Sequence, residues 1–382
     1  MTTVSSMPLE THAVSAPDRR HADEAVSAAR LISDTAGLDF CAETLADAEA
    51  IGLDTEFVRE RTFYPRPGLI QVSDGNRVAL LDAVSLPQMP GLGRLLDNRG
   101  QVKILHSVGE DLEVLRILTG TLPGPLFDTQ IAAAMLGFPL QCRYENLVAD
   151  VLGVDLPGGK ARSDWCKRPL TRDLTTYAAQ DVIWLPRLHA ILTEALQTRG
   201  RLAWLQEDCE RLVNASSNDV GESPVLRVKG AGSLNDEQLE ILVRLAEWRD
   251  EEARRRNLPR SFVIRDDIML ALAGSAPGTE RERQLRSLPP PLHRRYADGL
   301  AEILASAARS QFERPTALQS LSPDQRERIK ACQAAVTSLA TEIQVEPALL
   351  ASRREITRLV RGETPDWMHG WRGPLLGEIL QS

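Results

Sequence analysis

Between residues 29 and 196 the apolar positions alternate between the spacing of strands and the spacing of helices. A short apolar run at residues 31–32 is followed by runs that predict strands at residues 50–57, 68–73, 78–81 and 102–106. Helical spacing of the apolar positions predicts helices at residues 38–48, 91–96, 110–118, 129–136, 144–152 and 172–196. The turn-forming residues at 74–76 join two of the strands in a hairpin. Three successive strands, then one more strand among many helices, predict an α/β domain whose mixed sheet is covered by helices.

Beyond residue 233 the pattern is helical only. One apolar stripe runs through residues 239–246, and a second, at residues 329–343, follows about ninety residues later. Each stripe precedes a turn marked by proline and then a shorter helix. In the second unit Ser352 and Glu355 have the spacing of a capping box. The pattern predicts a diverged tandem repeat of one small helical unit.

The same pattern divides the chain into five segments. Residues 1–24 are rich in small and polar residues without an apolar period, which predicts a disordered tail. We expect the α/β domain to span residues 25–213 and a linker rich in Ser, Asn and Gly to span residues 214–233. Two helical domains are expected at residues 234–310 and 311–382.

Length and composition exclude several classes of protein. The 382 residues, 43% of them hydrophobic, are enough for two or three globular domains. No run of about 18 uncharged apolar residues is present, and residues 1–20 lack the order of a signal peptide, so we expect a cytoplasmic protein without a membrane partner. The five cysteines lie far apart and form no CxxC pair, which argues against disulfides and against a zinc site.

The net charge of -8 is carried by residues 1–230, and residues 231–382 are neutral. Because neither part is basic, the sequence argues against a protein that coats nucleic acid non-specifically. Arginines nevertheless cluster at residues 254–260 and 281–295, so we expect local basic faces on the helical half.

Asp54 and Glu56 are the first candidates for chemistry. They follow the apolar residues 50–53, and alternate residues of a strand share a face, so both carboxylates project together. Two adjacent carboxylates ionise together at low cost only when a cation lies between them. The competing interpretation is a strand end in solvent, where acidic residues are common.

Tyr177 and Asp181 are the second candidate pair, four residues apart on one face of a helix. Asp181 lies among apolar positions, where a carboxylate needs a partner. Asp111 is the third candidate, in the first turn of a predicted helix, a position that helix capping also explains. Together Asp54, Glu56, Asp111 and Asp181 can hold two ions of the magnesium type through oxygen ligands.

Three segments that contain these residues closely resemble the exonuclease motifs of the ribonuclease D family. The segments are residues 51–57, 106–112 and 177–182. Further matches lie at residues 61–65, 69–71, 127–130 and 160–170. The family belongs to the DEDD exonuclease superfamily, in the branch with tyrosine in the third motif. The two helical units are similar to the family's helicase-and-RNase-D C-terminal (HRDC) domains.

The resemblance implies an RNase H-like domain that hydrolyses RNA from its 3′ end to 5′-mononucleotides, with precursor transfer RNA as the characteristic substrate. Asp54, Glu56, Asp111 and Asp181 would hold two divalent ions, Mg²⁺ or Mn²⁺, with Asp54 bridging them. Tyr177 would hold or deprotonate the attacking water. The helical domains are expected to contribute affinity and not chemistry. Two alternatives stay open, a DNA-directed exonuclease of the same superfamily and an RNA-binding protein with an inactive site.

Six neighbouring residues are candidates for contact with the RNA, namely Thr55, Phe57, His106, Lys160, Arg162 and Arg168. For the first three, packing inside the protein explains the residue equally well or better. The three cations lie in a glycine-containing segment before the third motif, where they can meet the phosphate backbone. Asp128 fits a helix N-cap better than a fifth metal ligand.

Overall fold

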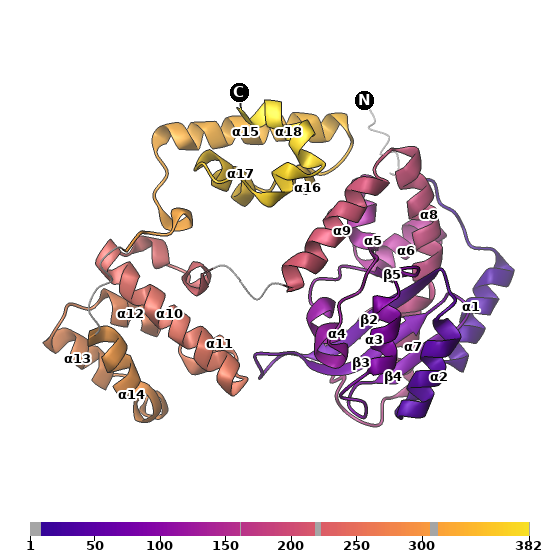
Figure 1. Cartoon of the computed structure of the whole chain (residues 1–382), viewed down its shortest axis with the longest axis horizontal. Coiled ribbons are helices and arrows are strands. Elements are labelled where there is room, and N and C mark those ends of the chain that lie inside the picture. Colours follow the sequence, from indigo (N-terminus) through magenta and orange to yellow (C-terminus); the bar gives the residue numbers. More distant parts are fainter. Residues whose placement is uncertain (1–8, 161, 218–222, 306–311, 382) are drawn as a thin grey trace.

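The computed structural model describes residues 9–160, 162–217, 223–305 and 312–381. An α/β domain is followed by two helical domains, which we call the first and the second (Figure 1). This architecture confirms the predicted fold class. Within the described residues, no helix is both long enough and apolar enough to cross a membrane.

The α/β domain is built on one mixed sheet with the strand order β1-β4-β3-β2-β5-β6. The strands are β1 (Arg30–Ile32), β2 (Ala50–Val58), β3 (Arg66–Ser73), β4 (Val78–Asp82), β5 (Val102–Leu105) and β6 (Leu126–Asp128). β2, β3 and β4 form an antiparallel meander, and β1, β5 and β6 extend it through parallel pairs. The predicted strands and hairpin are confirmed, but β6 was missed because three residues are too few for a visible alternation.

Nine helices of the described chain cover this sheet. They are α1 (Ala16–Ala28), α2 (Thr35–Leu45), α3 (Pro90–Asp97), α4 (Asp111–Thr119), α5 (Thr129–Met135), α6 (Tyr144–Leu152), α7 (Arg172–Ile183), α8 (Leu185–Thr198) and α9 (Leu202–Ser217). The predicted single helix over residues 172–196 is wrong. It breaks at Trp184, because Pro186 cannot donate the backbone hydrogen bond that would continue α7.

The N-terminal segment differs from the predicted disordered tail of residues 1–24. Ser15 caps α1, and Ala22 and Ala25 of this helix are buried against the domain. Upstream, the backbone amide of His12 donates to the carbonyl of Val151 at 2.7 Å. The buried residues of α1 are alanines, whose small side chains give too weak an apolar pattern to predict that the helix packs on the domain. Residues 1–8 lie outside the described part of the chain.

The linker is shorter than the predicted residues 214–233. Residues 214–217 continue α9, and residues 218–222 lie outside the described part. The short 3₁₀ helices at Pro224–Arg227 and Ala231–Ser233 already belong to the first helical domain, because Val225, Val228 and Ala231 are buried in its core. The sequence analysis missed these core residues because they are isolated apolar positions among Gly and Ser and form no period.

The two helical domains share a repeated unit, as the apolar stripes predicted. The first contains α10 (Asp236–Arg256), α11 (Arg260–Val263), α12 (Asp266–Gly274), α13 (Thr279–Arg286) and α14 (Pro290–Ala305). The second contains α15 (Pro323–Glu342), α16 (Pro347–Leu350), α17 (Arg353–Val360) and α18 (Arg372–Gln381). α15, α16 and α17 each begin 87 residues after α10, α11 and α12. The capping box at Ser352 and Glu355 is confirmed.

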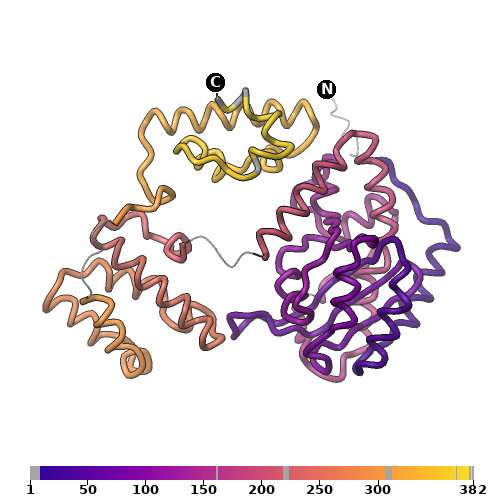
Figure 2. The backbone as a smooth tube through the Cα atoms, viewed as in Figure 1, coloured from indigo at the N-terminus to yellow at the C-terminus, as the bar shows by residue number. Residues whose placement is uncertain are grey.

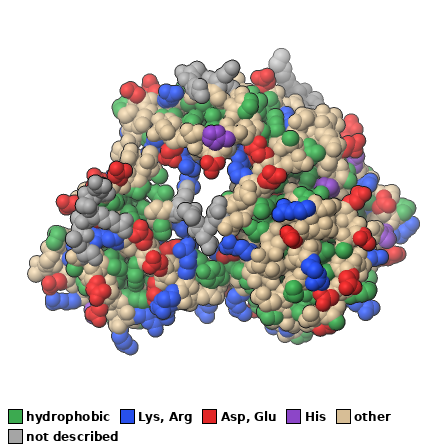
Figure 3. All heavy atoms as spheres, in the orientation of Figure 1, with side chains coloured by type: hydrophobic (Ala, Val, Ile, Leu, Met, Phe, Trp, Pro, Cys, Tyr) green, Lys and Arg blue, Asp and Glu red, His purple; other side chains and the backbone are tan. Residues whose placement is uncertain are grey.

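The second helical domain folds back onto α9 of the α/β domain, so that the three domains surround an open space (Figures 2 and 3). Its buried apolar residues join those of the α/β domain in one continuous core, whereas the first helical domain has a core of its own. At the contact, Arg372 binds both carboxylate oxygens of Asp208 at 2.7 and 2.9 Å. The rings of Trp204 and Trp371 stack beside this pair with centroids 4.4 Å apart.

Arg372→Gln should loosen the second helical domain. Asp208, only 4% exposed, would lose its bidentate partner and keep only the ion pair with Arg211 and the hydrogen bond from the Trp371 indole, which costs about 2 kcal/mol of unfolding free energy. Urea denaturation followed by tryptophan fluorescence measures this loss, because Trp204 and Trp371 lie at the contact. Arg353→Gln, an exposed change in the same domain, is the control, and equal stability of the two variants would contradict the assignment.

Candidate active site

Three carboxylates meet over the centre of the sheet. Asp54 and Glu56 lie on β2, and Asp181 comes from α7, which packs across β2, β3 and β4. Ligand oxygens of these three residues all lie within 4.8 Å of one another. They line a cavity of about 220 Å³ together with Tyr177. The predicted D-x-E pair and the third motif are therefore neighbours in space.

Gly52 allows α7 and α8 to approach β2 this closely. A Cβ atom at residue 52 would lie 2.9 Å from the carbonyl oxygen of Val182 and 2.8 Å from Cβ of Leu185. Because Val182 directly follows Asp181, any side chain here would push the third carboxylate away from Asp54. The glycine thus sets the distance between the first and third motifs.

Asp111 joins the site through Thr55. The Thr55 hydroxyl donates a hydrogen bond to the Asp111 carboxylate, and both side chains are buried. Thr55 alternates with Asp54 and Glu56 along β2, so it faces α4. This side chain does more than pack, since it fixes the fourth carboxylate beside the cluster of three.

The electrostatics of the cluster are unfavourable without a cation. Burial, and then repulsion from Asp181 and Asp111, raises the pKa of Glu56 to about 9. Burial and the other three carboxylates raise the pKa of Asp54 well above its usual range, and burial raises the pKa of Asp111 to about 6. Carboxylate oxygens at this spacing are the donors that hard divalent ions prefer, so the residues fit a metal site.

Tyr177 stands one helical turn from Asp181 on α7. A hydrogen bond from its hydroxyl opposes the rise in the pKa of Asp181 that burial and Glu145 cause. Burial raises the pKa of Tyr177 itself, so the phenol stays protonated at neutral pH. Its ring lies 6.2 Å from that of Trp165, which is fully buried. This packing aims the hydroxyl into the cavity.

Three residues of the site were missed in the sequence. Tyr144 and Glu145, at the start of α6, line the same cavity. Gln71 is paired with Asp54 across β2 and β3, and its Nε2 donates to the Asp54 carboxylate at 3.4 Å. Only strand register and helix placement bring these residues in, and neither can be read from spacing along the chain.

The candidates for RNA contact lie in different surroundings. Lys160 and Arg162 are exposed, and Gly158, two residues before Lys160, lies beside the Glu145 carboxylate at the cavity. Phe57 is half-buried and packs against the core. Both ring nitrogens of His106 have protein partners, the Thr129 hydroxyl at 2.8 Å and the Cys142 carbonyl at 2.9 Å. Their contacts with RNA stay predictions, and the geometry favours the two exposed cations.

Arg168 is engaged within the fold, and its predicted contact with RNA stays a prediction. Its guanidinium bonds both oxygens of the Asp82 carboxylate and the carbonyls of Gly68, Trp165 and Lys167. All three of its nitrogens are thereby occupied. The contacts fix the loop that seats Trp165 behind Tyr177. The sequence does not show that Arg168 pairs with the buried Asp82, because the two residues lie 86 positions apart.

Asp128 caps α5, as predicted. Its carboxylate accepts hydrogen bonds from the backbone amides of Gln130 and Ile131. It also accepts from the amides of Ser107 and Val108 at 3.1 and 2.9 Å, which ties the segment before α4 to β6. With four amide donors on it, this carboxylate stabilises the fold and is not part of the cluster of three.

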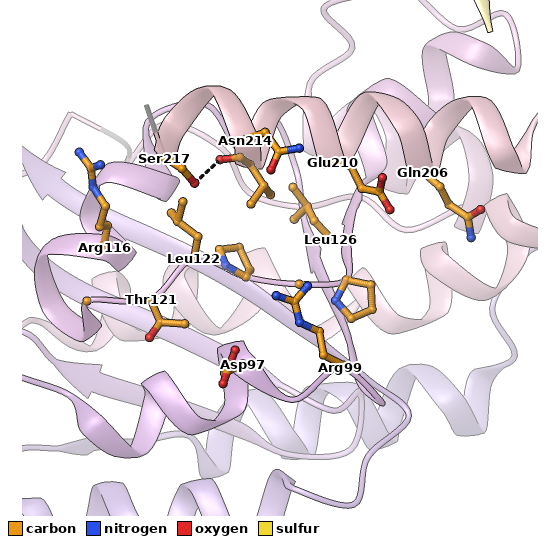
Figure 4. Close-up of a pocket in the computed structure, with 15 residues that line it drawn as sticks. Asp97, Arg99, Arg116, Thr121, Leu122, Leu126, Gln206, Glu210, Asn214 and Ser217 are labelled. Atoms are coloured by element: carbon orange, nitrogen blue, oxygen red, sulfur yellow. Dashed lines mark hydrogen bonds between the residues drawn. The ribbon is translucent and has the colours of Figure 1, made fainter. Parts of the chain in front are cut away.

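A larger cavity of the α/β domain, about 940 Å³, lies between α9 and the loop at residues 120–126 (Figure 4). Its two acidic residues, Asp97 and Glu210, stand on opposite sides. Arg99 and Arg116 balance their charge. Without grouped carboxylates this cavity offers no site for a divalent ion, so the smaller cavity is the catalytic candidate.

Comparison with known proteins defines the class. Residues 29–197 match the family model of a 3′-5′ exonuclease, and residues 238–304 match the HRDC domain. Residues 323–380 match the C-terminal HRDC domain of ribonuclease D. The fold and the carboxylate cluster thus belong to a 3′-5′ exonuclease that carries two HRDC domains.

The particular family follows from full-length relatives. A ribonuclease D of Pseudomonas paraeruginosa is 38% identical over 341 residues, which cover 86% of this chain and 90% of the relative. The crystal structure of Escherichia coli RNase D, described as an exoribonuclease involved in structured RNA processing, superposes with a TM-score of 0.84. It shares 32% identity and covers 92% of this chain and 97% of its own. This chain belongs to the ribonuclease D family and is a 3′-5′ exoribonuclease, which acts on RNA with a 3′ end.

Without divalent ions, the free energy of unfolding should fall as pH rises from about 5 to 9. Glu56 has a pKa of about 9 in the folded chain against an ordinary 4.5, so in this window the folded state holds a proton that the unfolded state has released. Glu56 alone contributes roughly 1 kcal/mol per pH unit to this slope, which urea denaturation in chelator measures. Glu56→Gln should flatten the slope, whereas the exposed Glu43→Gln should not. An unchanged slope in Glu56→Gln would contradict the assignment.

Proposed function

We propose that this exoribonuclease trims the 3′ ends of precursor transfer RNA by a two-metal mechanism. The observation that carries the proposal is the partly buried cluster of Asp54, Glu56 and Asp181 beside Tyr177, with Asp111 attached through Thr55. The link of the E. coli relative to structured RNA processing supports the substrate class. The five described cysteines are all free, which is compatible with work in the reducing cytoplasm.

Asp54, Glu56, Asp111 and Asp181 would hold the two ions. Bound there, Mg²⁺ or Mn²⁺ would activate water and stabilise the charge that develops on the leaving 3′-oxygen. Asp54 would be the residue shared between them, as its motif position implies; both Asp54 and Glu56 lie in the cluster of three and are repelled by Asp111. Gln71 keeps the Asp54 carboxylate oriented through the hydrogen bond from its Nε2.

Tyr177 orients the attacking water. Its hydroxyl stays protonated because burial raises its pKa, so it donates or accepts a hydrogen bond and does not act as a base. Trp165 behind the ring restricts its movement. Lys160 and Arg162, exposed on the nearby loop, neutralise phosphates of the RNA strand that enters the cavity.

Two alternative functions are separated by one experiment. A DNA-directed exonuclease would use the same carboxylates, and an inactive RNA-binding protein would lack turnover. All four carboxylates and the tyrosine are present, which favours activity. Incubation with 3′-extended transfer RNA or single-stranded DNA, each with Mg²⁺ or chelator, should release mononucleotides from the RNA only, and only with metal. Faster attack on DNA would contradict the proposal.

Asp54→Asn should abolish hydrolysis while the domain stays folded. The amide removes one negative charge from the cluster, so metal affinity is lost but the repulsion within the fold is relieved. Mononucleotide release and circular dichroism measure the two effects. Asp173→Asn, an exposed change at the start of α7, is the matched control. Near-normal turnover by folded Asp54→Asn would contradict the two-metal assignment.

Tyr177→Phe should lower kcat by about 10²–10⁴-fold, the usual contribution of a group positioned for proton transfer. The ring that packs near Trp165 is retained, so RNA affinity should change little. Single-turnover kinetics separate the two quantities. Tyr64→Phe, in the exposed loop after β2, is the control. A normal rate for Tyr177→Phe would leave the tyrosine with a packing role only.

A further inference from the structure

A cavity of about 940 Å³ lies where the α/β domain meets the first helical domain. One wall is the loop after β2, which includes Arg59 and Phe63, and the other wall is the helical domain. Phe63, only 9% exposed, is buried in the core of the helical domain, with the Arg260 guanidinium 4.7 Å above its ring. The amide of Tyr64 donates to the Asn257 side chain at 3.0 Å. These contacts hold the two walls together.

Cations dominate the lining of this junction cavity. Its acidic residues are Glu60, Asp266 and Asp267, and its cations are Arg59, Arg227, Lys229, Arg249, Arg260 and Arg265. Six positive charges face three negative ones in a chain whose net charge is -8. Figure 3 shows Lys and Arg side chains gathered where the two domains meet. Three of these cations also pair with acids just outside the lining, Arg59 with Glu113 at 2.8 Å and both Arg227 and Arg260 with Asp250.

Most of these cations are paired with carboxylates, but some of their donor groups have no partner. Asp266 is bound by Arg249 at 2.6 Å, and Asp267 by Arg265 at 3.0 Å. Within the described residues, however, the ammonium of Lys229 has no hydrogen bond or ion pair. The buried Nε of Arg249, a residue 4% exposed, also lacks a hydrogen-bond partner there. A buried donor without a partner is costly, which favours a ligand with acceptor oxygens.

The junction cavity lies close to the carboxylate cluster along the chain. Arg59 follows Glu56 by three residues, and three extended residues span at most about 10 Å. An RNA strand whose 3′ end lies at the carboxylates can therefore reach the cavity within a few nucleotides. Guanidinium groups match the geometry of phosphate oxygens better than a point charge does.

We propose that the junction cavity binds the phosphate backbone of the RNA strand upstream of the nucleotide being removed. The inference rests on the proposed ribonuclease function, and it assigns the first helical domain a definite task. Only an RNA strand long enough to reach the cavity contacts both of its walls, and through them the first helical domain. RNA too short to reach it is held by the catalytic cavity alone.

The test changes only cations that the fold does not need. The cavity variant combines Arg227→Gln, Lys229→Gln and Arg265→Gln in the full chain. Arg227 lies 3.9 Å from Asp250, and Asp250 still has Arg254 and Arg260 as ion-pair partners when Arg227 is replaced. The ion pair between Arg265 and Asp267 is exposed, so its loss should cost little stability. The control variant removes the same charge from exposed positions of α13 and α14 by Arg283→Gln, Arg286→Gln and Arg294→Gln. Truncation is avoided, because it would also remove the second helical domain from α9.

Affinity is measured by fluorescence anisotropy with single-stranded RNA of 2, 6 and 12 nucleotides, in chelator and at several salt concentrations. For the 12-mer, the cavity variant should raise Kd roughly tenfold and lower the log–log salt slope by about 2, near 0.7 for each lost contact. The dinucleotide should bind all three proteins alike. An equal loss in the control variant, or unchanged binding of the 12-mer by the cavity variant, would overturn the inference.

The same RNA with Mg²⁺ tests the underlying function independently. If the unaltered chain releases mononucleotides but the two variants bind the 12-mer alike, the junction cavity is refuted and the nuclease stands. If the unaltered chain releases none, the proposed function fails, whatever the binding data give. Thermal unfolding of each variant by circular dichroism checks that the fold is retained.

Discussion

The close placement of four carboxylates, partly or fully removed from water, is the constraint on which the rest of this molecule depends. Asp54, Glu56 and Asp181 present ligand oxygens within 4.8 Å, and Asp111 stands beside them. Burial raises the pKa of all four groups, and repulsion from the other carboxylates raises the pKa of Asp54 and Glu56 further. The fold must therefore hold the carboxylates against their repulsion until cations neutralise it. What makes the site costly for folding is also what makes it selective for divalent ions.

The supporting contacts are made by the residues around the carboxylates. Gly52 admits the junction of α7 and α8, and Thr55 holds Asp111 from the other side of β2. Behind the tyrosine, the ion pair between Arg168 and Asp82 fixes the loop that carries Trp165. These groups restrict the catalytic side chains so that little reorganisation remains when ions and RNA bind.

The two helical domains are attached to the α/β domain by different kinds of contact. The second shares a continuous core with the α/β domain and is fastened by Arg372 and Asp208, so it behaves as part of that domain. The first helical domain keeps its own core, and among the described residues of the α/β domain only Phe63 is inserted into it. Its attachment is thus mainly polar and cationic, and the space left between the walls suits a charged strand. The second helical domain completes the scaffold, and the first is the one that we propose to bind the substrate.

The sequence by itself determined the order of elements and the repeat in the helical half, because apolar periodicity depends on neighbours along the chain. It also identified Asp54, Glu56, Asp111, Tyr177 and Asp181 as a group, through their motifs and the family resemblance, and the structure brings them together. Tertiary structure alone decided that α1 is ordered, that Arg168 belongs to Asp82, and that Gln71 and Glu145 enter the site. These outcomes rest on contacts between distant segments, whose energies depend on distance and burial in the folded chain and leave no periodic trace in the sequence.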